Sequence, residues 1–456
     1  MPHTGHTRPS LRRRSPAHPA QVIVASYAAA LAAGTGLLML PVSVTPEAGG
    51  SAGLVDALFT AGSAVSVTGL IVVDTATYWS GFGHVVILAL IELGGLGLMT
   101  FASLLGLLLV HRLGLRSRMA TSASLGTPTT GDLRELVVGI AKVALTVQAA
   151  TAVVLAARFA LTYDYPPGQA LWHGVFHAGS AFNNAGFALY SDNVMGFVAD
   201  PWVCLPLAVA VILGGVGFPV FIELRRHVRV PRLWSMNTRI VLAGTAVLLV
   251  GGTVTITALE WDNPGTLGPL DVPAKLLAGF FAATVARTAG FNSVDTAEMN
   301  TQTWFAQDVL MFIGAGPAGT AGGIKITTAA VLLAIVLTEI RGEGAVNVFG
   351  KRLSRSVHRQ AITVLTLSVA VVMGSTWALL ITTQFTLDQL VFEVISAFAT
   401  VGLSTGITHL LPDGGQLLLV VVMFAGRVGP VTLATALALR SRKRLYELPK
   451  ERPLIG

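Results

Sequence analysis

The amino-acid sequence predicts an all-α polytopic membrane protein built from four repeats, and three observations predict this fold class. Hydrophobic residues make up 53% of the 456 residues and charged residues 12%, with a mean hydropathy of +0.70. Soluble domains carry about 25% charged residues. Several apolar stretches reach the roughly 20 residues that cross a bilayer. Four shorter apolar segments of similar sequence recur along the chain, each between two of these stretches.

The long apolar stretches predict eight spans, two in each repeat, at 20–42, 84–110, 135–161, 202–222, 238–259, 303–340, 361–384 and 415–439. The short segment between the two spans of a pair cannot cross a bilayer and fits a re-entrant helix. The repeats are therefore expected at 20–115, 135–227, 237–342 and 356–442. We expect a disordered cytoplasmic tail at 1–19 and a cytoplasmic C-terminal tail at 443–456.

Basic residues gather on one face of this predicted topology. The clusters are Arg8 with Arg12–Arg14; Arg112, Arg116 and Arg118; Arg225, Arg226, Arg229, Arg232 and Arg239; Arg341, Lys351, Arg352, Arg355 and Arg359; and Arg440, Arg442, Lys443, Arg444, Lys450 and Arg452. The positive-inside rule makes this face cytoplasmic, with both termini inside and the chain in the plasma membrane. The net charge of +7 then reflects anchoring in the lipid bilayer, so we expect no nucleic-acid partner. Cys204 is the single cysteine, which leaves no disulfide framework.

Four short segments align without a gap, and each carries a glycine after an apolar helix. In each segment the shared glycine is the third residue of a triplet, and Leu or Phe follows it. The triplets are Val67-Thr68-Gly69, Asn184-Ala185-Gly186, Thr288-Ala289-Gly290 and Thr400-Val401-Gly402. Rings of backbone carbonyls hold dehydrated potassium in selective pores, and glycine lets such carbonyls face the axis. A glycine C-cap explains any one segment alone, but not four in register. Each repeat is therefore predicted as span–pore helix–filter–span around one central pore, with K⁺ as the transported ion.

The four predicted filter strands differ in regularity and surroundings. Strands one and four most resemble the T-V-G of potassium channels, whereas strands two and three are looser. Arg287 precedes the third glycine, where we expect it to bond carbonyls or an acid such as Asp295 behind the filter. His173 and His177 lie four residues apart without a nearby carboxylate, so we interpret them as structural or pore-mouth histidines. Most acids fall on the outer face, where together they would concentrate cations.

The second span of each repeat carries a Gly-x-x-Gly pattern, at Gly94–Gly97, Gly214–Gly217, Gly316–Gly319 and Gly426–Gly429. Close helix packing explains it in repeats one and two. In repeat three the run Ile313–Lys325 reads IGAGPAGTAGGIK, which cannot form a straight helix. A broken backbone at membrane depth must face protein or water, so this loop is the candidate gate. Its gate residues are Gly314, Gly316, Gly319, Thr320, Gly322, Gly323 and Lys325.

Arg427 adds a charge near the middle of the last predicted span. Ionisable residues at such depth usually face the interior and are functional, so Arg427 is a gate or barrier candidate. Its expected partner is Glu92 or the carbonyls of the 314–323 loop, and the alternative is a buried structural ion pair. A phosphate-binding loop at 313–325 is excluded, because Ile326 follows Lys325 where Ser or Thr is required.

On the motifs SVTGL, NNAGF, RTAGF, TVGLSTG, GAGPAGTAGGIK and FAGRVGP, the chain resembles the Trk/Ktr/HKT superfamily of potassium transporters, especially the membrane subunits of bacterial Ktr systems. The resemblance implies potassium uptake by a homodimer with one pore per protomer. It also implies a cytosolic ring of nucleotide-binding RCK-domain regulators, and a repeat-three loop that gates beneath the filter. Glycine in all four strands accompanies potassium preference in this superfamily, and Na⁺ is a candidate activator.

Two other classes of function agree less well with the sequence. A proton-coupled secondary transporter needs acids in mid-span, and only Glu92 qualifies. A polytopic membrane enzyme needs paired acids or a His–Asp cluster at one membrane face, and the outer acids are scattered singly. We therefore expect no catalytic residues, no bound cofactor and no enzymatic activity.

Overall fold

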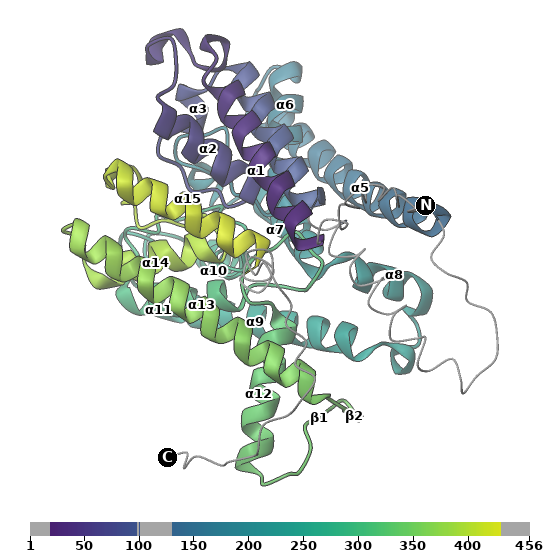
Figure 1. The fold of residues 1–456 in the computed structure, drawn as a ribbon. Coiled ribbons are helices and arrows are strands. Elements are labelled where there is room, and N and C mark those ends of the chain that lie inside the picture. The colour runs from purple at the N-terminus through teal and green to yellow at the C-terminus, as the bar shows by residue number, and fades with distance from the viewer. Residues whose placement is uncertain (1–18, 98–99, 101–129, 430–456) are drawn as a thin grey trace, which may run out of the picture.

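The computed structural model describes residues 19–97, 100 and 130–429. Within them the chain is a helical bundle with one short hairpin of antiparallel strands, β1 (Asn347–Val348) and β2 (Lys351–Arg352), at one end (Figure 1). Both predicted tails lie outside the described residues, apart from residue 19, as do the basic residues at 112–118 and 440–452.

The helices are divided into four consecutive groups along the chain. The first holds α1 (Pro19–Leu38), η1 (Pro41–Ser43), η2 (Pro46–Ala48), α2 (Leu54–Ser66), α3 (Thr75–Tyr78) and the helix Gly81–Gly97. The second holds α5 (Thr130–Thr162), α6 (Pro167–Asn183), η3 (Met195–Phe197), α7 (Pro201–Val216), α8 (Phe218–His227) and η4 (Pro231–Leu233). The third holds α9 (Met236–Glu260), α10 (Val272–Val285), α11 (Thr301–Ile313) and α12 (Ile326–Ile340). The fourth holds α13 (Arg355–Thr382), α14 (Leu387–Phe398), η5 (Thr408–Leu410) and α15 (Asp413–Val428).

Long apolar helices surround short buried ones. Among the described residues, three helices are long and apolar enough to cross a membrane, namely Val137–Thr162 within α5, α9 and α13, and α7 with α8 would make a fourth. These helices expose large apolar side chains such as Leu145, Val247 and Met373, as expected where lipid is the solvent. The short helices α2, α6, α10 and α14 are instead buried along most of their length. Each short helix therefore lies inside the bundle.

Two of the predicted spans are not continuous helices. The predicted span 202–222 breaks at Gly217, which has a left-handed φ of +93°, and α7 and α8 meet there at 95°. Pro219 then occupies the first turn of α8, a position where its missing N–H costs nothing. The predicted span 303–340 divides into α11 and α12, because the helix ends at Ile313 and resumes only at Ile326. The glycine-rich run between them is not helical, as its sequence predicts.

Candidate functional site

Each short buried helix leads into a strand with an unusual alternation of backbone conformation. The first residue of every strand has a left-handed φ: Val67 (57°), Asn184 (62°), Thr288 (79°) and Thr400 (50°). So does the glycine two residues later: Gly69 (95°), Gly186 (70°), Gly290 (68°) and Gly402 (96°). The residue between them is not left-handed in any strand. A left-handed β-branched residue is a strained outlier, and alternating conformations turn successive carbonyls toward one side instead of opposite sides.

The four glycines pack against neighbouring strands in a closed circle. An added Cβ would lie less than 3.0 Å from a backbone oxygen at every one of them: Gly69 against Ala185, Gly186 against Ala289, Gly290 against Val401, and Gly402 against Thr68. Each strand thus meets the next strand of the sequence, and the fourth returns to the first. All twelve predicted filter residues lie in this ring, where no side chain fits at the glycine positions.

Serine hydroxyls of the preceding helices hold two of the four strands. In strands one and four a serine hydroxyl of the preceding helix accepts the glycine N–H, from Gly69 to Ser63 at 3.0 Å and from Gly402 to Ser396 at 3.1 Å. The equivalent Thr284 donates to a carbonyl of its own helix instead. The equivalent Ser180 hydroxyl, before strand two, is buried and has no hydrogen-bond partner among the described residues. Strands one and four are therefore supported alike, and strands two and three lack this bond.

A cavity of about 240 Å³ opens above the ring and is lined by all four glycines. Asp74, Asp192 and Asp295 line it from the first three groups of helices, and His409 lines it from the fourth. Each of the three carboxylates accepts a backbone N–H of its own loop, which fixes its position. Three fixed carboxylates give this mouth a negative potential that favours cations.

The non-helical run 314–325 lies directly below the ring and touches three of its strands. The Thr320 hydroxyl donates to the Phe182 carbonyl at 3.0 Å and lies 3.0 Å from the Asn184 side-chain amide. The Gly322 N–H donates to the Thr288 hydroxyl at 3.3 Å. An added Cβ on Gly322 would also collide with the carbonyl of Ala399. The loop therefore fills the space beneath strands two, three and four.

The two ends of this loop lie against each other. Gly314 and Gly323 are in backbone contact, and the Ile326 N–H donates to the Ala315 carbonyl at 3.0 Å. Lys325 has a left-handed φ of +76°, and its ammonium donates to the carbonyls of Ala321 and Gly322. The loop thus closes on itself at its base, while its tip reaches under the ring.

Arg427 fixes the tip of the loop from the last helix. Its guanidinium, 4% exposed, donates to the Thr320 carbonyl, to the Gly94 carbonyl at 3.1 Å and to the Tyr27 hydroxyl at 3.3 Å. The expected bond to loop carbonyls is therefore present. Glu92 is not its partner, because the Glu92 carboxylate accepts from the Gln148 amide at 2.9 Å. Tyr27 was not singled out from the sequence, where its only signal is a hydroxyl beside Ser26 in a mostly apolar stretch.

The remaining predicted polar residues have structural surroundings. Arg287 is 5% exposed and donates to the Thr245 hydroxyl at 3.3 Å, whereas Asp295 bonds its own loop, so the expected Asp295 partner is wrong. His177 donates from Nδ1 to the His173 carbonyl and accepts the Leu189 N–H at Nε2. This use of both ring nitrogens leaves no lone pair on His177 for a metal. No cluster of three or more metal-ligating side chains occurs in the described part of the chain.

The Gly-x-x-Gly patterns have a shared packing role in three of the groups. An added Cβ on Gly94, Gly214 or Gly426 would collide with the carbonyl of Val65, Phe182 or Phe398, the residue four before the ring glycine. The helix Gly81–Gly97, α7 and α15 are thereby held against the ends of α2, α6 and α14. Gly316 instead faces the carbonyl of Val216, in the second group. The third pattern therefore serves the loop rather than helix packing.

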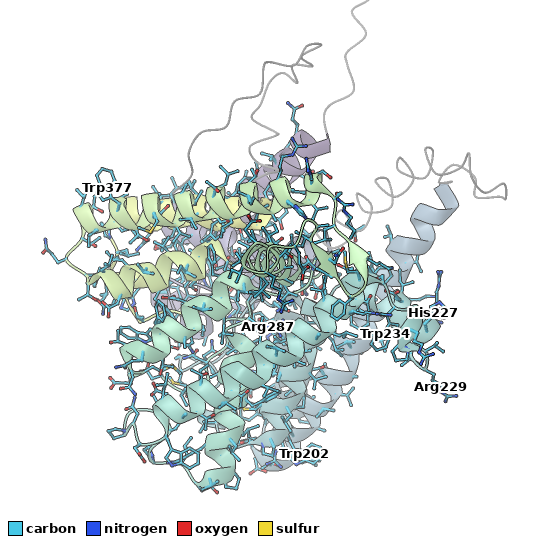
Figure 2. All side chains as sticks on the ribbon, turned by 90° about the horizontal axis from the view of Figure 1, so that it is seen from below. Trp202, His227, Arg229, Trp234, Arg287 and Trp377 are labelled. Carbon is cyan, nitrogen blue, oxygen red and sulfur yellow. The ribbon has the colours of Figure 1, made fainter. Side chains whose placement is uncertain are left out.

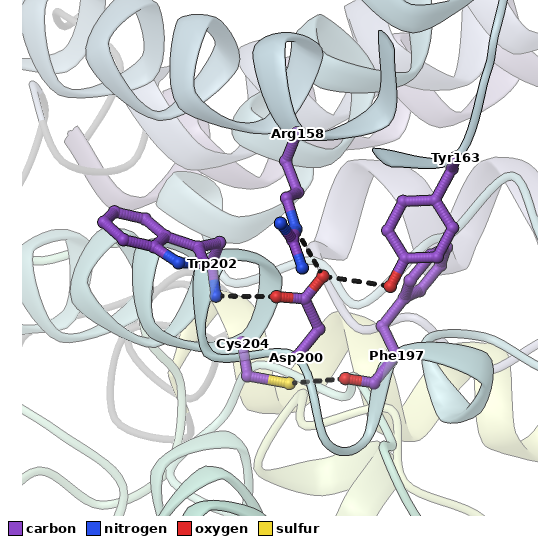
Figure 3. Close-up of polar contacts among 6 residues, drawn as sticks. All are labelled: Arg158, Tyr163, Phe197, Asp200, Trp202 and Cys204. Atoms are coloured by element: carbon purple, nitrogen blue, oxygen red, sulfur yellow. Dashed lines mark hydrogen bonds and ion pairs between the residues drawn. The ribbon is translucent and has the colours of Figure 1, made fainter. Parts of the chain in front are cut away.

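One ion pair forms among the described residues, and it lies away from the ring. The Arg158 Nε donates to the Asp200 carboxylate at 2.8 Å, and the Tyr163 hydroxyl donates to the same oxygen at 2.9 Å (Figure 3). Asp200 also accepts the Trp202 N–H at the start of α7. Burial and the Asp200 carboxylate raise the pKa of Tyr163 to about 12. This network joins the ends of α5 and α7 and has no contact with the ring.

Comparisons with known proteins place this geometry in a family. Residues 8–445 match the TrkH family, described as cation transport protein. The chain is 41% identical over 420 residues to the Ktr system potassium uptake protein B of Bacillus subtilis (strain 168), covering 92% of this chain and 93% of that protein. It is 32% identical over 451 residues to the potassium/sodium uptake protein NtpJ of Enterococcus hirae, covering 98% and 99%. The crystal structure of the potassium transporter TrkH from Vibrio parahaemolyticus matches with a TM-score of 0.74 at 18% identity, over 95% of this chain and 87% of that one.

Proposed function

Because this chain belongs to the TrkH family of cation transport proteins, we propose that it takes up potassium ions across the plasma membrane. The family consists of transporters rather than enzymes. The observation that carries the proposal is the closed ring of Gly69, Gly186, Gly290 and Gly402, in which left-handed backbone directs carbonyls to one side. Carbonyl oxygens placed around an axis replace the water that a potassium ion loses on entry.

The proposed architecture is four repeats of span–pore helix–filter–span around one pore, with eight spans and both termini cytoplasmic. The helices α2, α6, α10 and α14 serve as pore helices in this scheme, each with its C-terminal end beside a filter strand. The partial negative charge of a helix C-terminus favours a cation there. The carboxylate-lined mouth is then the outer entrance, where cations collect before dehydration.

The 314–325 loop is the proposed gate. It occupies the space beneath the filter and bonds to filter strands two and three, so ions cannot pass while it stays docked. Arg427 stabilises the docked position through the Thr320 carbonyl and adds positive charge below the ring. Its bonds to Gly94 and Tyr27 connect the loop to the first repeat.

Arg427→Ala is expected to increase basal potassium flux several-fold while protein abundance changes little. Hydrogen bonds from charged groups contribute about 1.5–3 kcal/mol each, so losing the bond to Thr320 weakens docking by roughly tenfold or more. Arg427→Lys keeps the charge but not the planar fork, and should be intermediate. The measurement is uptake divided by the membrane-protein level of each variant. If flux changes only in proportion to abundance, Arg427 is a structural residue and its role in gating is wrong.

The proposed assembly is a homodimer whose cytoplasmic face docks a ring of RCK-domain regulatory subunits. Three relatives are named as parts of Ktr systems, which supports a partner subunit. The basic residues of the proposed cytoplasmic face, such as the exposed Arg341 at the end of α12, offer such a partner a cationic surface. The name of the Enterococcus relative includes sodium, which supports testing Na⁺ as activator or second cargo.

Growth rescue tests the proposed function. The chain is expressed in a bacterium that lacks its own potassium uptake systems, at limiting potassium, with and without sodium and with and without a co-expressed RCK-domain partner. We expect rescue that the partner increases. A chain that reaches the membrane yet restores no growth and no rubidium uptake under any of the four conditions would refute potassium uptake.

A further inference from the structure

The segment 218–234, formed by α8, η4 and the residues around them, lies across the end of α7 rather than in line with it. α7 and α8 meet at 95°. If α7 crosses the bilayer, as the proposed architecture requires, α8 therefore runs along the cytoplasmic membrane surface. Phe218 and Val220 are buried against the bundle, so one side of α8 is anchored there. Figure 2 shows His227, Arg229 and Trp234 together at the periphery of the molecule.

The beginning of this segment is joined directly to the gate loop. The Phe218 N–H, at the first position of α8, donates to the Ala318 carbonyl at 3.2 Å. Gly217 packs so closely on the Pro317 carbonyl that an added Cβ would lie less than 3.0 Å from it. A displacement of α8 must therefore move the loop, or break this contact.

The outer side of the segment carries cations without acidic partners. Arg225, Arg226, Arg229 and Arg232 are exposed, and none forms an ion pair with any described residue. Glu223, the one acid of the segment, faces inward, where its carboxylate accepts from the hydroxyls of Ser235 and Thr238 at the start of α9. It holds α8 against α9 and leaves the arginines uncompensated.

Apolar side chains are exposed between these arginines. Val228 is 62%, Val230 46% and Leu233 58% exposed. Water is a poor solvent for such a set, whereas a segment that lies at the headgroup level buries its apolar side chains while its arginines meet phosphates. The exposed arginines and apolar side chains of this segment together therefore favour contact with an anionic membrane leaflet over exposure to water.

We propose that segment 218–234 binds anionic phospholipid headgroups of the cytoplasmic leaflet and thereby holds the gate loop in its docked position. The inference rests on the proposed function, since it takes the 314–325 loop to be the gate. In this structure α8 lies at 95° to α7 and contacts the docked loop at the same time. A ligand shifts an equilibrium toward the state that it binds better, so headgroups that bind the flat α8 favour the docked loop.

The test is potassium flux from purified protein without any regulatory subunit, in vesicles of phosphatidylcholine alone or of phosphatidylcholine with phosphatidylglycerol. One arginine near an anionic surface contributes roughly fivefold in affinity, so basal flux should be at least about fivefold lower with phosphatidylglycerol. The variant Arg225→Gln, Arg226→Gln, Arg229→Gln, Arg232→Gln should lose this difference. A matched variant that removes four exposed charges elsewhere, Lys351→Gln, Arg352→Gln, Arg355→Gln, Arg359→Gln, should retain it.

Native mass spectrometry of phosphatidylglycerol adducts provides a readout that does not depend on flux. We expect fewer retained lipids for the α8 variant than for the matched variant. Equal lipid dependence in all three proteins overturns the proposal, as does an equal loss in both variants, which would show a general charge effect. If only a regulatory protein loses its binding to the α8 variant, the surface is a protein interface and the lipid proposal is wrong. Absent flux with selective adduct loss would refute potassium transport but support the lipid site.

Discussion

Gly69→Ser is expected to lower the preference for potassium over sodium by about tenfold or more, which corresponds to roughly 1.4 kcal/mol of selectivity. A side chain at this position meets the Ala185 carbonyl at less than 3.0 Å, and the φ of +95° is disfavoured for any residue except glycine. The first strand must therefore shift, and the shift moves carbonyls of strand two as well. Competition of sodium against rubidium uptake in proteoliposomes measures the change.

Two further substitutions make this result specific. Gly290→Ser should have the same effect, because Gly290 faces the Val401 carbonyl in the same way. Gly374→Ser in α13 is the matched control, since Gly374 is exposed and a Cβ there meets nothing within 4 Å. Unchanged ion preference in both ring variants would refute the filter, and an equal change in the control would show a non-specific effect of serine.

Deleting residues 316–322 is expected to raise basal potassium flux by an order of magnitude or more and to reduce dependence on a regulator. The deletion is compatible with the fold, because Gly314 and Gly323 already touch and the Ile326 N–H bonds to Ala315 at the base of the loop. It removes Thr320 and Gly322, which fill the space under the strands. Flux through purified protein in vesicles, without any partner, measures the effect.

A substitution that keeps the loop length tests whether the 314–325 loop obstructs the ion path or has only a structural role. Thr320→Val removes the hydroxyl that donates to the Phe182 carbonyl but leaves the loop in place, so its flux should lie between those of the intact and the shortened chain. Monodispersity and membrane abundance show whether each variant folds. A shortened chain that folds normally and still conducts no more than the intact one contradicts the gating role.

Much of the ring was predictable because its requirements are local. A glycine shortly after a short apolar helix leaves a local signature, and the four copies align in the sequence. The break between α11 and α12 was predictable for the same reason, since the glycines and Pro317 of this run disfavour a helix. The left-handed φ of Val67, Thr288 and Thr400 was not predictable, because β-branched residues disfavour it. The order of strands around the ring, with each glycine against the next carbonyl, follows only from the folded backbone.

Partnerships between distant residues were less predictable. Arg427 bonds Thr320, Gly94 and Tyr27, which lie in the first and third groups of helices, and the Glu92 carboxylate accepts from Gln148. The sequence left Glu92 and the carbonyls of the 314–323 loop as alternative partners of Arg427, because a guanidinium is satisfied by a carboxylate or by carbonyls that a broken helix exposes. The loop carbonyl is the partner that the structure shows. The bend at Gly217 escaped prediction because the apolar pattern continues through it, although the adjoining Pro219 is a local signal.

The circular order of the ring bears on how the chain is made. The Thr68 carbonyl has Gly402 as its neighbour. The first strand therefore gains this neighbour only after the fourth strand has been synthesised. Until then, the first and third strands each lack one neighbouring strand, and the backbone of Thr68 and of Gly290 lacks its packing partner. A polypeptide that terminates before α14 never gains the fourth strand. Chains truncated before α14 therefore cannot close the ring, because neither Gly402 nor Val401 is present to meet Thr68 and Gly290.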